Sequence, residues 1–294
     1  MTTKQLVMSD QQSLTSKSLK ALLSSSALPG NEARILLAQV LEEHYQLPRS
    51  ALLSRDDMLL NESAYKAWKQ LEQRRINGEP IAYIVGKKGF HAIELMVAPG
   101  VLIPRPETEL LVEIALAQIS TLNRPSQILD LGTGSGAIAL AIANASPQSS
   151  LTATDQSDEA LAIAKMNAQA LGLENQVQFF QGDWYAALPQ KMQFDIIVSN
   201  PPYIPHLDPH LTWGDLRFEP VSALTDHASG LSCLETIISG ANQHLLPGGL
   251  LAVEHGFDQS AEVACFMKDA GLQDIEVHHD LAGHKRVVSA RKEI

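Results

Sequence analysis

From about residue 105 onward, the chain alternates short apolar runs with amphipathic segments. Short apolar runs are typical of buried parallel strands, and amphipathic segments between them are typical of helices that cover a sheet. The predicted strands are 127–130, 151–154, 177–181, 194–199, 250–254, 274–279 and 286–290, and the predicted helices include 109–119, 137–145 and 157–171. This alternation predicts an α/β fold with a seven-stranded, mostly parallel sheet and helices on both of its faces.

The earlier part of the chain has a different pattern. From Ser16 to about Arg75 the apolar residues recur at helical spacing, which predicts four or five short helices that end before Gly78-Glu79-Pro80. Residues 83–102 then alternate apolar and polar side chains around several glycines, as expected for a β-hairpin. We therefore expect a helical domain over residues 1–80, a hairpin linker over 81–104 and the α/β domain over 105–294.

The charge of the chain is acidic and unevenly distributed. The net charge is −11, and residues 1–80 hold ten Lys and Arg against nine Asp and Glu, so residues 81–294 hold twelve against twenty-four. An acidic surface of this kind repels phosphate backbones. We therefore expect no direct nucleic-acid partner.

Cysteine use and hydropathy bear on the location of the protein. Cys233 and Cys265 are the only cysteines, which are too few for a disulfide scaffold and fit a reducing cytoplasm. No apolar run approaches the roughly 18 residues of a membrane-spanning helix, and the first twenty residues do not resemble a signal peptide. His206 and His210 have the spacing of a helical metal pair, but the neighbouring prolines oppose a helix there. We expect a cytoplasmic protein without a membrane or metal partner.

A glycine-rich segment follows the first predicted strand of the sheet. Residues 128–130 run into Gly132-Thr133-Gly134-Ser135-Gly136, and a predicted helix comes next. Glycines permit a tight turn and let a ligand approach backbone amides at a helix start. The segment also fits the looser dinucleotide-binding pattern, and Asp155 at the next strand end suits a ribose diol in either case. In the simplest alternative, the glycines only form the turn and Asp155 caps a helix.

Neighbouring acidic and aromatic residues favour S-adenosylmethionine over a dinucleotide. Asp130 directly precedes the glycines, where a carboxylate suits a cationic amino-acid group and would repel a pyrophosphate. Asp183 and Trp184 follow the third strand and offer a carboxylate and an aromatic face to an adenine. We expect the amides of residues 132–136 to hold the cofactor, with its ribose at Asp155; a core position for Trp184 is the alternative.

The fourth predicted strand, 194–199, ends in Asn200-Pro201-Pro202-Tyr203. Each proline fixes its own φ and keeps the residue before it out of the helical region, so Asn200 and Pro201 are held extended. The side-chain carbonyl of Asn200 and the backbone carbonyl of Pro201 then form a rigid pair of acceptors for one planar NH2 group. The ring of Tyr203 can pack on the face of that group. In isolation the same four residues also suit an ordinary turn.

A conjugated NH2 group is a poor nucleophile because its lone pair is delocalised. Two fixed acceptors aim the nitrogen at a sulfonium methyl and stabilise the positive charge that develops on it. No general base is needed, because the nitrogen becomes acidic as the methyl arrives and its proton leaves to water. A glutamine amide, adenine N6 and cytosine N4 all present this group, so the motif identifies the reacting group and not the molecule.

Four segments together resemble one known family. They are Ile103-Pro-Arg-Pro-Glu-Thr-Glu109, the glycine turn from Asp130 to Ile138, Asn200 to Tyr203, and Asp215-Leu-Arg-Phe-Glu-Pro220 with Ala223-Leu224. The combination resembles the HemK/PrmC family over nearly the whole chain. Members of that family are class I, Rossmann-like methyltransferases. They transfer a methyl group from S-adenosylmethionine to the side-chain nitrogen of the glutamine in the Gly-Gly-Gln motif of class-1 peptide chain release factors.

The resemblance implies roles for particular residues. It implies cofactor contacts at 132–136, Asp155, Trp184 and Asn200, and a substrate glutamine held by residues 200–203, with Leu102 as a possible apolar wall. It also implies that the helical domain recognises a protein partner. We separately expect the protein to be a monomer. No role is assigned to Arg105, Glu107 or Glu219.

Two other functions fit the same reacting group. Related family members methylate a glutamine in a ribosomal protein, and only the overall layout favours release factors. A nucleic-acid adenine-N6 methyltransferase is the further alternative, and the acidic charge of residues 81–294 opposes it.

Overall fold

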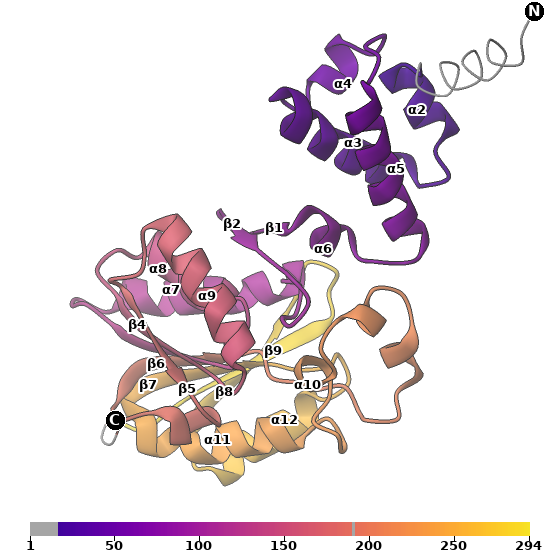
Figure 1. Ribbon diagram of the computed structural model, residues 1–294. Helices are drawn as coiled ribbons and strands as arrows, with labels where there is room; N and C mark the ends of the chain where they lie inside the picture. The colour runs from indigo at the N-terminus through magenta and orange to yellow at the C-terminus, as the bar shows by residue number, and fades with distance from the viewer. Residues whose placement is uncertain (1–16, 190–191) are drawn as a thin grey trace, which may run out of the picture. The chain divides into compact units, whose positions relative to one another are not determined.

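The computed structural model describes residues 17–189 and 192–294, so the start of the predicted helical domain, residues 1–16, lies outside the described residues. The chain divides into two compact units, Met1–Val85 and Gly86–Ile294 (Figure 1). In the described part of the chain, no helix has both the length and the apolar character that crossing a membrane requires.

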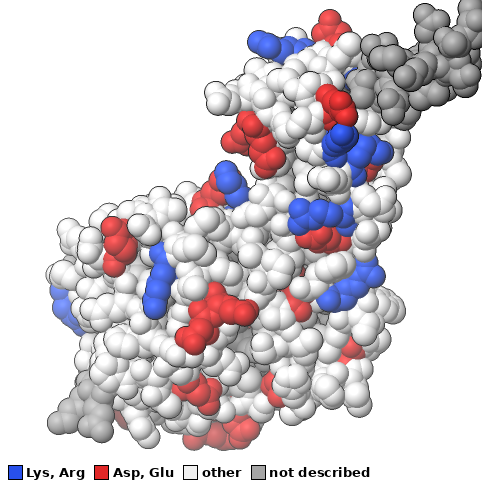
Figure 2. Space-filling view, viewed as in Figure 1, with Lys and Arg blue, Asp and Glu red and all other residues white. Residues whose placement is uncertain are grey.

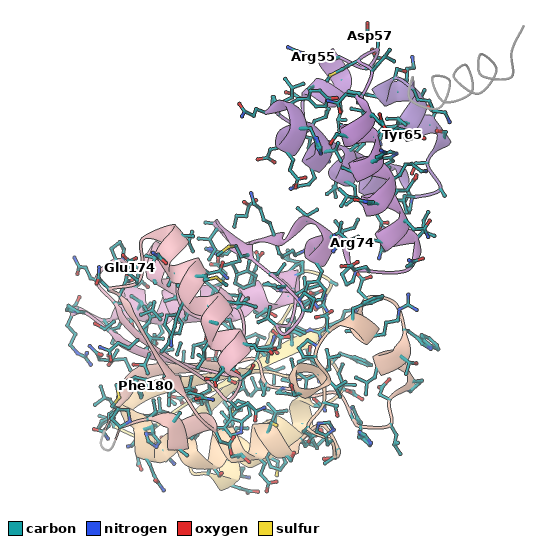
Figure 3. All side chains as sticks on the ribbon, viewed as in Figure 1. Arg55, Asp57, Tyr65, Arg74, Glu174 and Phe180 are labelled. Atoms are coloured by element: carbon teal, nitrogen blue, oxygen red, sulfur yellow. The ribbon has the colours of Figure 1, made fainter. Side chains whose placement is uncertain are left out.

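The first unit is helical, as predicted. Its described helices are α2 (Leu19–Ser25), α3 (Gly30–Tyr45), α4 (Ala51–Ser54), α5 (Glu62–Ile76) and α6 (Ile81–Val85). They pack on a shared apolar core that includes Leu36, Leu41 and the fully buried Trp68. Asn61 caps α5 by accepting a hydrogen bond from the backbone N–H of Ala64. Near the other end of α5, Arg74 Nε donates to Glu79 Oε2 at 2.8 Å (Figure 3).

The second unit is built on the seven-stranded sheet that the alternation predicted. The strands are β3 (Gln127–Leu131), β4 (Ser150–Asp155), β5 (Val177–Gln181), β6 (Phe194–Ser199), β7 (Leu245–Glu254), β8 (Gln273–His279) and β9 (Lys285–Arg291). Their spatial order is β5-β4-β3-β6-β7-β9-β8. The first five strands of this order are parallel, and β9 is antiparallel to both of its neighbours.

Helices cover both faces of this sheet (Figure 1). One core cluster joins the sheet to α7 (Glu109–Thr121), α8 (Ala137–Ala145), α9 (Asp158–Leu171) and the hairpin of β1 (Lys87–Phe90) and β2 (Ile93–Met96). A second cluster joins the opposite face to α11 (Ser232–His244) and α12 (Ser260–Asp269). Short turns complete the unit: η1 (Pro106–Thr108), η2 (Trp184–Ala187), η3 (Pro209–Thr212), η4 (Leu216–Phe218) and α10 (Val221–Leu224).

The hairpin begins later than the sequence pattern predicted. Tyr83 belongs to the short helix α6, where the buried Ile84 joins the core of the first unit, and Gly86 follows with φ +75°. The hairpin strands start only at Lys87. The alternation of apolar residues around glycines therefore predicted the hairpin correctly. It placed the start of the hairpin too early, because the apolar residues at 81–85 form one helical turn and not a strand.

The order of the strands locates a binding edge. The chain moves outward from β3 through β4 to β5, and then returns to the other side of β3 with β6 and β7. Loops at the carboxyl ends of β3 and its neighbours therefore diverge, which opens a crevice at that edge of the sheet. The glycine turn, Asp155 and Asn200 all lie at these strand ends.

Candidate active site

A cavity of about 440 Å³ lies at the carboxyl ends of β3, β4, β5 and β6. This volume falls in the range of about 300–1,000 Å³ that is typical of small-molecule sites. Of the residues predicted for the site, the following line the cavity: Leu102, Gly132, Thr133, Gly134, Ser135, Asp155, Asp183, Trp184, Asn200 and Pro202. The cavity brings together residues from four strand ends and from the segment before η1.

The glycine turn forms one wall of the cavity. The backbone N–H groups of Gly132 and Thr133 both donate to the Thr154 carbonyl at 2.9 Å, which anchors the turn to β4. Gly134 has φ +57°, and a Cβ added there would meet nothing within 4 Å, so this glycine opens on free space. Gly136 differs, because a Cβ there would lie 2.9 Å from the Leu140 side chain. Gly136 therefore permits close helix packing and does not line the cavity, which corrects the prediction for this residue.

The structure also corrects the prediction for Asp130. Its side chain is fully buried and accepts hydrogen bonds from the Thr133 hydroxyl at 2.7 Å and from the Ala139 N–H at 3.2 Å. Burial raises the pKa of Asp130 to about 7. The residue supports the turn from beneath and is not part of the cavity wall. The sequence pattern of a carboxylate before a glycine turn is the same whether the side chain faces the cavity or is buried beneath the turn.

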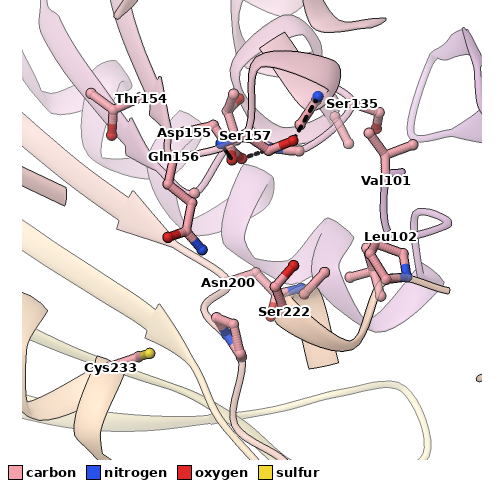
Figure 4. Close-up of a pocket in the computed structure, with 18 of the residues that line it drawn as sticks. Val101, Leu102, Ser135, Thr154, Asp155, Gln156, Ser157, Asn200, Ser222 and Cys233 are labelled. Carbon is pink, nitrogen blue, oxygen red and sulfur yellow. Dashed lines mark hydrogen bonds between the residues drawn. The ribbon is translucent and has the colours of Figure 1, made fainter. Parts of the chain in front are cut away.

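Asp155 stands where a ribose diol was predicted. Its Oδ2 accepts from the Gly134 N–H and its Oδ1 from the Ser157 N–H, each at 2.9 Å (Figure 4). These two bonds fix the carboxylate while each oxygen keeps a lone pair for a ligand hydroxyl. Burial raises the pKa of Asp155 above its ordinary value, and the backbone N–H groups oppose that shift.

Trp184 extends the same wall with a strained backbone. Its φ is +43°, which is an outlier for a bulky residue. A Cβ added to Gly132 would lie 3.1 Å from the Trp184 ring, so the ring covers the glycine turn closely. Strain of this kind persists where the surroundings hold it, often at functional sites. Trp184 also packs against the second core cluster, so the core alternative is confirmed in part, while its contact with an adenine remains a prediction.

The cavity suits a ligand with several hydrogen-bonding groups. The Thr154 hydroxyl is buried against the cavity and has no hydrogen-bond partner among the described residues. A ligand group at that place would satisfy it, since buried polar atoms are normally paired. Together with the open space at Gly134, this hydroxyl makes the chain's own residues compatible with a nucleoside and an amino-acid moiety.

Asn200 faces the other side of the cavity, together with Leu102 and Ser222 (Figure 4). Its Nδ2 donates to the Thr108 hydroxyl oxygen at 3.0 Å. Because the NH2 end of the amide is engaged there, the carbonyl end is left as the acceptor. At the strand end before it, the Ser199 hydroxyl donates to the Leu131 carbonyl at 2.7 Å and joins β6 to the glycine turn.

The structure places Pro201 and Tyr203 differently from the prediction. Pro201 is buried, and neither residue lines the cavity. The Tyr203 hydroxyl donates to Glu254 Oε1 at 3.1 Å, and its ring packs against the second core cluster. Tyr203 therefore stabilises the loop from its core side, and its ring does not face a substrate in the cavity.

Sequence reasoning missed the contacts that close the cavity opposite the glycine turn. Glu219 has a fully buried side chain that pairs with Arg105, and its Oε2 accepts from the Ile103 N–H at 3.0 Å. Burial raises the pKa of Glu219, and Arg105 opposes this shift. Residues 103–105 and the loop before α10 are thereby joined, with Pro220 on the cavity wall. These partners lie more than a hundred positions apart in the chain, so no local pattern marks the pair.

Another missed group lies between β6 and α11. Asp226, His227 and Cys233 line the cavity. Asp226 accepts from the N–H groups of Ala228 and Gly230 at 2.8 and 2.9 Å, which shapes the loop. Burial raises the pKa of the Cys233 thiol to about 11, so this cysteine is not an activated nucleophile. The sequence before α11 offered one usable signal, the Asx-turn pattern at Asp226.

Among the charged side chains on the visible face of the second unit, acidic ones predominate (Figure 2). No continuous basic stripe crosses this face, in agreement with the charge count of residues 81–294. Among the described residues, no group of three or more His, Cys, Asp and Glu side chains is arranged to hold a metal ion.

The sequence of the chain is similar to those of known methyltransferases. Residues 107–214 match the family model of the methyltransferase small domain, and residues 15–86 match that of the PrmC N-terminal domain. A release factor glutamine methyltransferase of Bordetella pertussis is 48% identical over 269 residues, which cover 92% of this chain and 97% of that protein. Its counterpart in Vibrio cholerae is 45% identical, with 90% of each chain covered.

Solved structures show the same fold. The crystal structure of a methyltransferase from Pyrococcus furiosus matches with a TM-score of 0.52 at 17% sequence identity, and covers 77% of this chain and 100% of that one. At this identity the likeness concerns the fold alone, and it confirms the predicted Rossmann-like methyltransferase architecture.

Proposed function

The chain belongs to the release factor glutamine methyltransferase family, and from this premise we propose the reaction in detail. The protein transfers a methyl group from S-adenosylmethionine to the side-chain amide nitrogen, N5, of the glutamine in the Gly-Gly-Gln motif of class-1 peptide chain release factors. S-adenosylhomocysteine is the second product. The observation that carries this proposal is the oriented Asn200 amide at the cavity, with its NH2 end held by Thr108.

Residues of the cavity hold the cofactor in this proposal. Asp155, whose oxygens are fixed by backbone N–H groups, would accept hydrogen bonds from the ribose hydroxyls. Trp184 and Asp183 would hold the adenine, and the turn from Gly132 to Ser135 would hold the amino-acid end. When bound, S-adenosylmethionine supplies an electrophilic methyl carbon on a sulfonium centre.

Asn200 orients the substrate amide. Its carbonyl oxygen, left free because Nδ2 is held by Thr108, accepts one N–H of the glutamine amide. This acceptor directs the nitrogen lone pair toward the methyl carbon and stabilises the developing positive charge. With S-adenosylmethionine bound, its sulfonium centre would supply the methyl group to this nitrogen and leave as S-adenosylhomocysteine, and the methylated nitrogen would lose one proton to water. Leu102 and Pro202 provide apolar walls that exclude water from the reacting atoms.

The helical unit is proposed to recognise the protein substrate. The cavity selects an NH2 group and cannot by itself select a release factor over another protein. The match of residues 15–86 to the PrmC N-terminal domain supports a role for this unit that is separate from the chemistry. We further propose that the protein acts as a monomer in the cytoplasm, without contacting nucleic acid directly.

A direct test uses labelled S-adenosylmethionine and three separate acceptors: a class-1 release factor, a ribosomal protein mixture and duplex DNA. The proposal predicts that the label appears on the release factor, and that tandem mass spectrometry places it on the Gly-Gly-Gln glutamine. A release factor with Gly-Gly-Glu in place of Gly-Gly-Gln is the matched control and stays unlabelled. Label confined to the ribosomal proteins or to DNA would refute the choice of substrate.

A further inference from the structure

A buried carboxylate lies behind the Asn200 loop, outside the cavity wall. Glu254 is the last residue of β7 and is 1% exposed. In the parallel pairing of β6 with β7, Val253 lies opposite Ser199, so Glu254 is at the level where the Asn200 loop begins. Neither the glycine turn nor the substrate loop includes Glu254 in its sequence.

Burial of the Glu254 carboxylate destabilises the folded state. Burial raises the pKa of Glu254 to about 7, and its Oε2 has no hydrogen-bond partner among the described residues. An apolar side chain of similar size normally serves a protein core as well as a buried charge or better. Buried titratable groups with a shifted pKa are often found at functional sites.

The contacts of Glu254 lead to the substrate loop. The Tyr203 hydroxyl donates to Glu254 Oε1 at 3.1 Å. The backbone carbonyl of the same tyrosine accepts from Gln259 Nε2 at 3.0 Å, and Gln259 Oε1 in turn accepts from the Gly256 N–H at 2.8 Å. The last residue of β7 therefore holds the Tyr203 side chain, and Gln259, just after β7, holds its backbone. Since Tyr203 closes the Asn-Pro-Pro-Tyr segment, these bonds fix the end of the loop.

The other end of the loop is held by Thr108, whose hydroxyl oxygen accepts from Asn200 Nδ2. The segment is thus held at Asn200 by Thr108 and at Tyr203 by Glu254 and Gln259. Bonds at both ends of this short segment keep the Asn200 carbonyl in one direction.

We propose that Glu254 is a positioning residue for methyl transfer, which acts through Tyr203 to hold the loop that fixes the direction of the Asn200 carbonyl. The inference rests on the proposed function, because it concerns the same site. It differs from a purely structural role, in which Glu254 would affect the stability of the fold and leave the orientation of Asn200 unchanged.

The kinetic test compares two substitutions of Glu254 with a matched control. Glu254→Leu removes the acceptor and keeps the volume, whereas Glu254→Gln keeps an acceptor oxygen. The control is Asp195→Leu, because Asp195 is also a buried carboxylate, 4% exposed, but lies at the far end of β6 and pairs with Arg124. Activity is measured on an intact release factor, and cofactor affinity is measured separately by calorimetry.

The positioning role predicts a specific division of effects. Glu254→Leu lowers kcat by about 10- to 100-fold, as expected for a lost hydrogen bond to a charged group, and leaves cofactor affinity within about 3-fold. Glu254→Gln recovers most of the lost kcat, and Asp195→Leu lowers the unfolding temperature without lowering kcat. An unchanged kcat in Glu254→Leu overturns the inference, as does an equal loss of kcat in Asp195→Leu.

An NMR measurement tests the inference without measuring activity. Protein labelled with ¹⁵N-asparagine gives side-chain NH2 signals, and the Asn200→Ala variant identifies those of Asn200. We expect these signals to shift and to exchange faster with water in Glu254→Leu and to stay near their wild-type positions in Asp195→Leu. Unchanged Asn200 signals overturn the inference, even if the wild-type protein methylates no release factor and the proposed function fails. Tyr203→Phe removes the same hydrogen bond from the other side and gives the decisive spectrum should Glu254→Leu not fold.

Discussion

Replacement of Gly230 by alanine is expected to damage catalysis through the backbone of the substrate loop. Gly230 has φ +83°, and a Cβ added there would lie 2.3 Å from the Tyr203 carbonyl oxygen and 3.0 Å from Gln259 Nε2. Real Cβ atoms essentially never approach another heavy atom within 3.0 Å. Gly230 and the Tyr203 carbonyl must therefore separate by at least about 0.7 Å, and because both are backbone we expect the loop that carries Asn200 to shift.

The magnitude follows from two separate costs. An alanine at positive φ costs about 1–2 kcal/mol of folding free energy, and overpacking against the Tyr203 carbonyl adds about 1–3 kcal/mol. A misplacement of about 1 Å at an active site costs about 100-fold in rate. We therefore expect Gly230→Ala to lose about 2–5 kcal/mol of stability and about 10- to 100-fold in kcat.

Gly283 provides a control that separates these costs. It has the same φ of +83°, but a Cβ there would meet nothing within 4 Å. Gly283→Ala is expected to lose only the backbone term, about 1–2 kcal/mol in urea unfolding, and to keep its full kcat on a release factor. If both variants keep wild-type kcat, or if both lose it equally, the argument that the Tyr203 backbone sets the position of Asn200 is refuted.

Four further changes test other parts of the account. Asn200→Ala should abolish methyl transfer while circular dichroism and cofactor affinity stay near those of the wild type; near-normal turnover would contradict the role of its carbonyl. Asp155→Ala should weaken S-adenosylmethionine binding by about 10- to 100-fold in calorimetry, because a charge-assisted hydrogen bond is lost, and unchanged affinity would place the ribose elsewhere. Burial raises the pKa of Glu254 from 4.5 to about 7, so the folded state binds this proton more tightly, and the free energy of unfolding falls as pH rises between these two values. Glu254→Gln should remove up to about 1.4 kcal/mol per pH unit of that slope in urea unfolding, and an unaltered slope would refute the assignment. Deletion of residues 1–85 should weaken methylation of an intact release factor more than cofactor binding; equal losses would mean that the helical unit is only structural.

The central strands of the sheet were predictable because they are buried on both faces. Four of the six residues of 194–199 are apolar, and every residue of β6 is buried. The glycine turn and Asn200 followed from the same logic, since both come directly after such strands. The boundary of the hairpin was not predictable, because one helical turn at 81–85 buries apolar residues that also fit a strand.

The part of the site that the sequence did not reveal depends on contacts between distant residues. Asn200 is oriented by Thr108, which lies 92 positions earlier, and Tyr203 is held by Glu254, 51 positions later. No local periodicity carries such information. The errors at Asp130 and Tyr203 have the same cause: the sequence identified polar groups near the ligand edge, but only tertiary packing determines whether they face the cavity or the core.

A structure of the protein with S-adenosylhomocysteine and a Gly-Gly-Gln peptide tests the central claim most directly. The account predicts that the Asn200 carbonyl oxygen lies about 2.7–3.2 Å from the nitrogen of the peptide glutamine, with Nδ2 still on Thr108. An Asn200 amide turned away from the glutamine, or a glutamine bound outside the cavity, would contradict it.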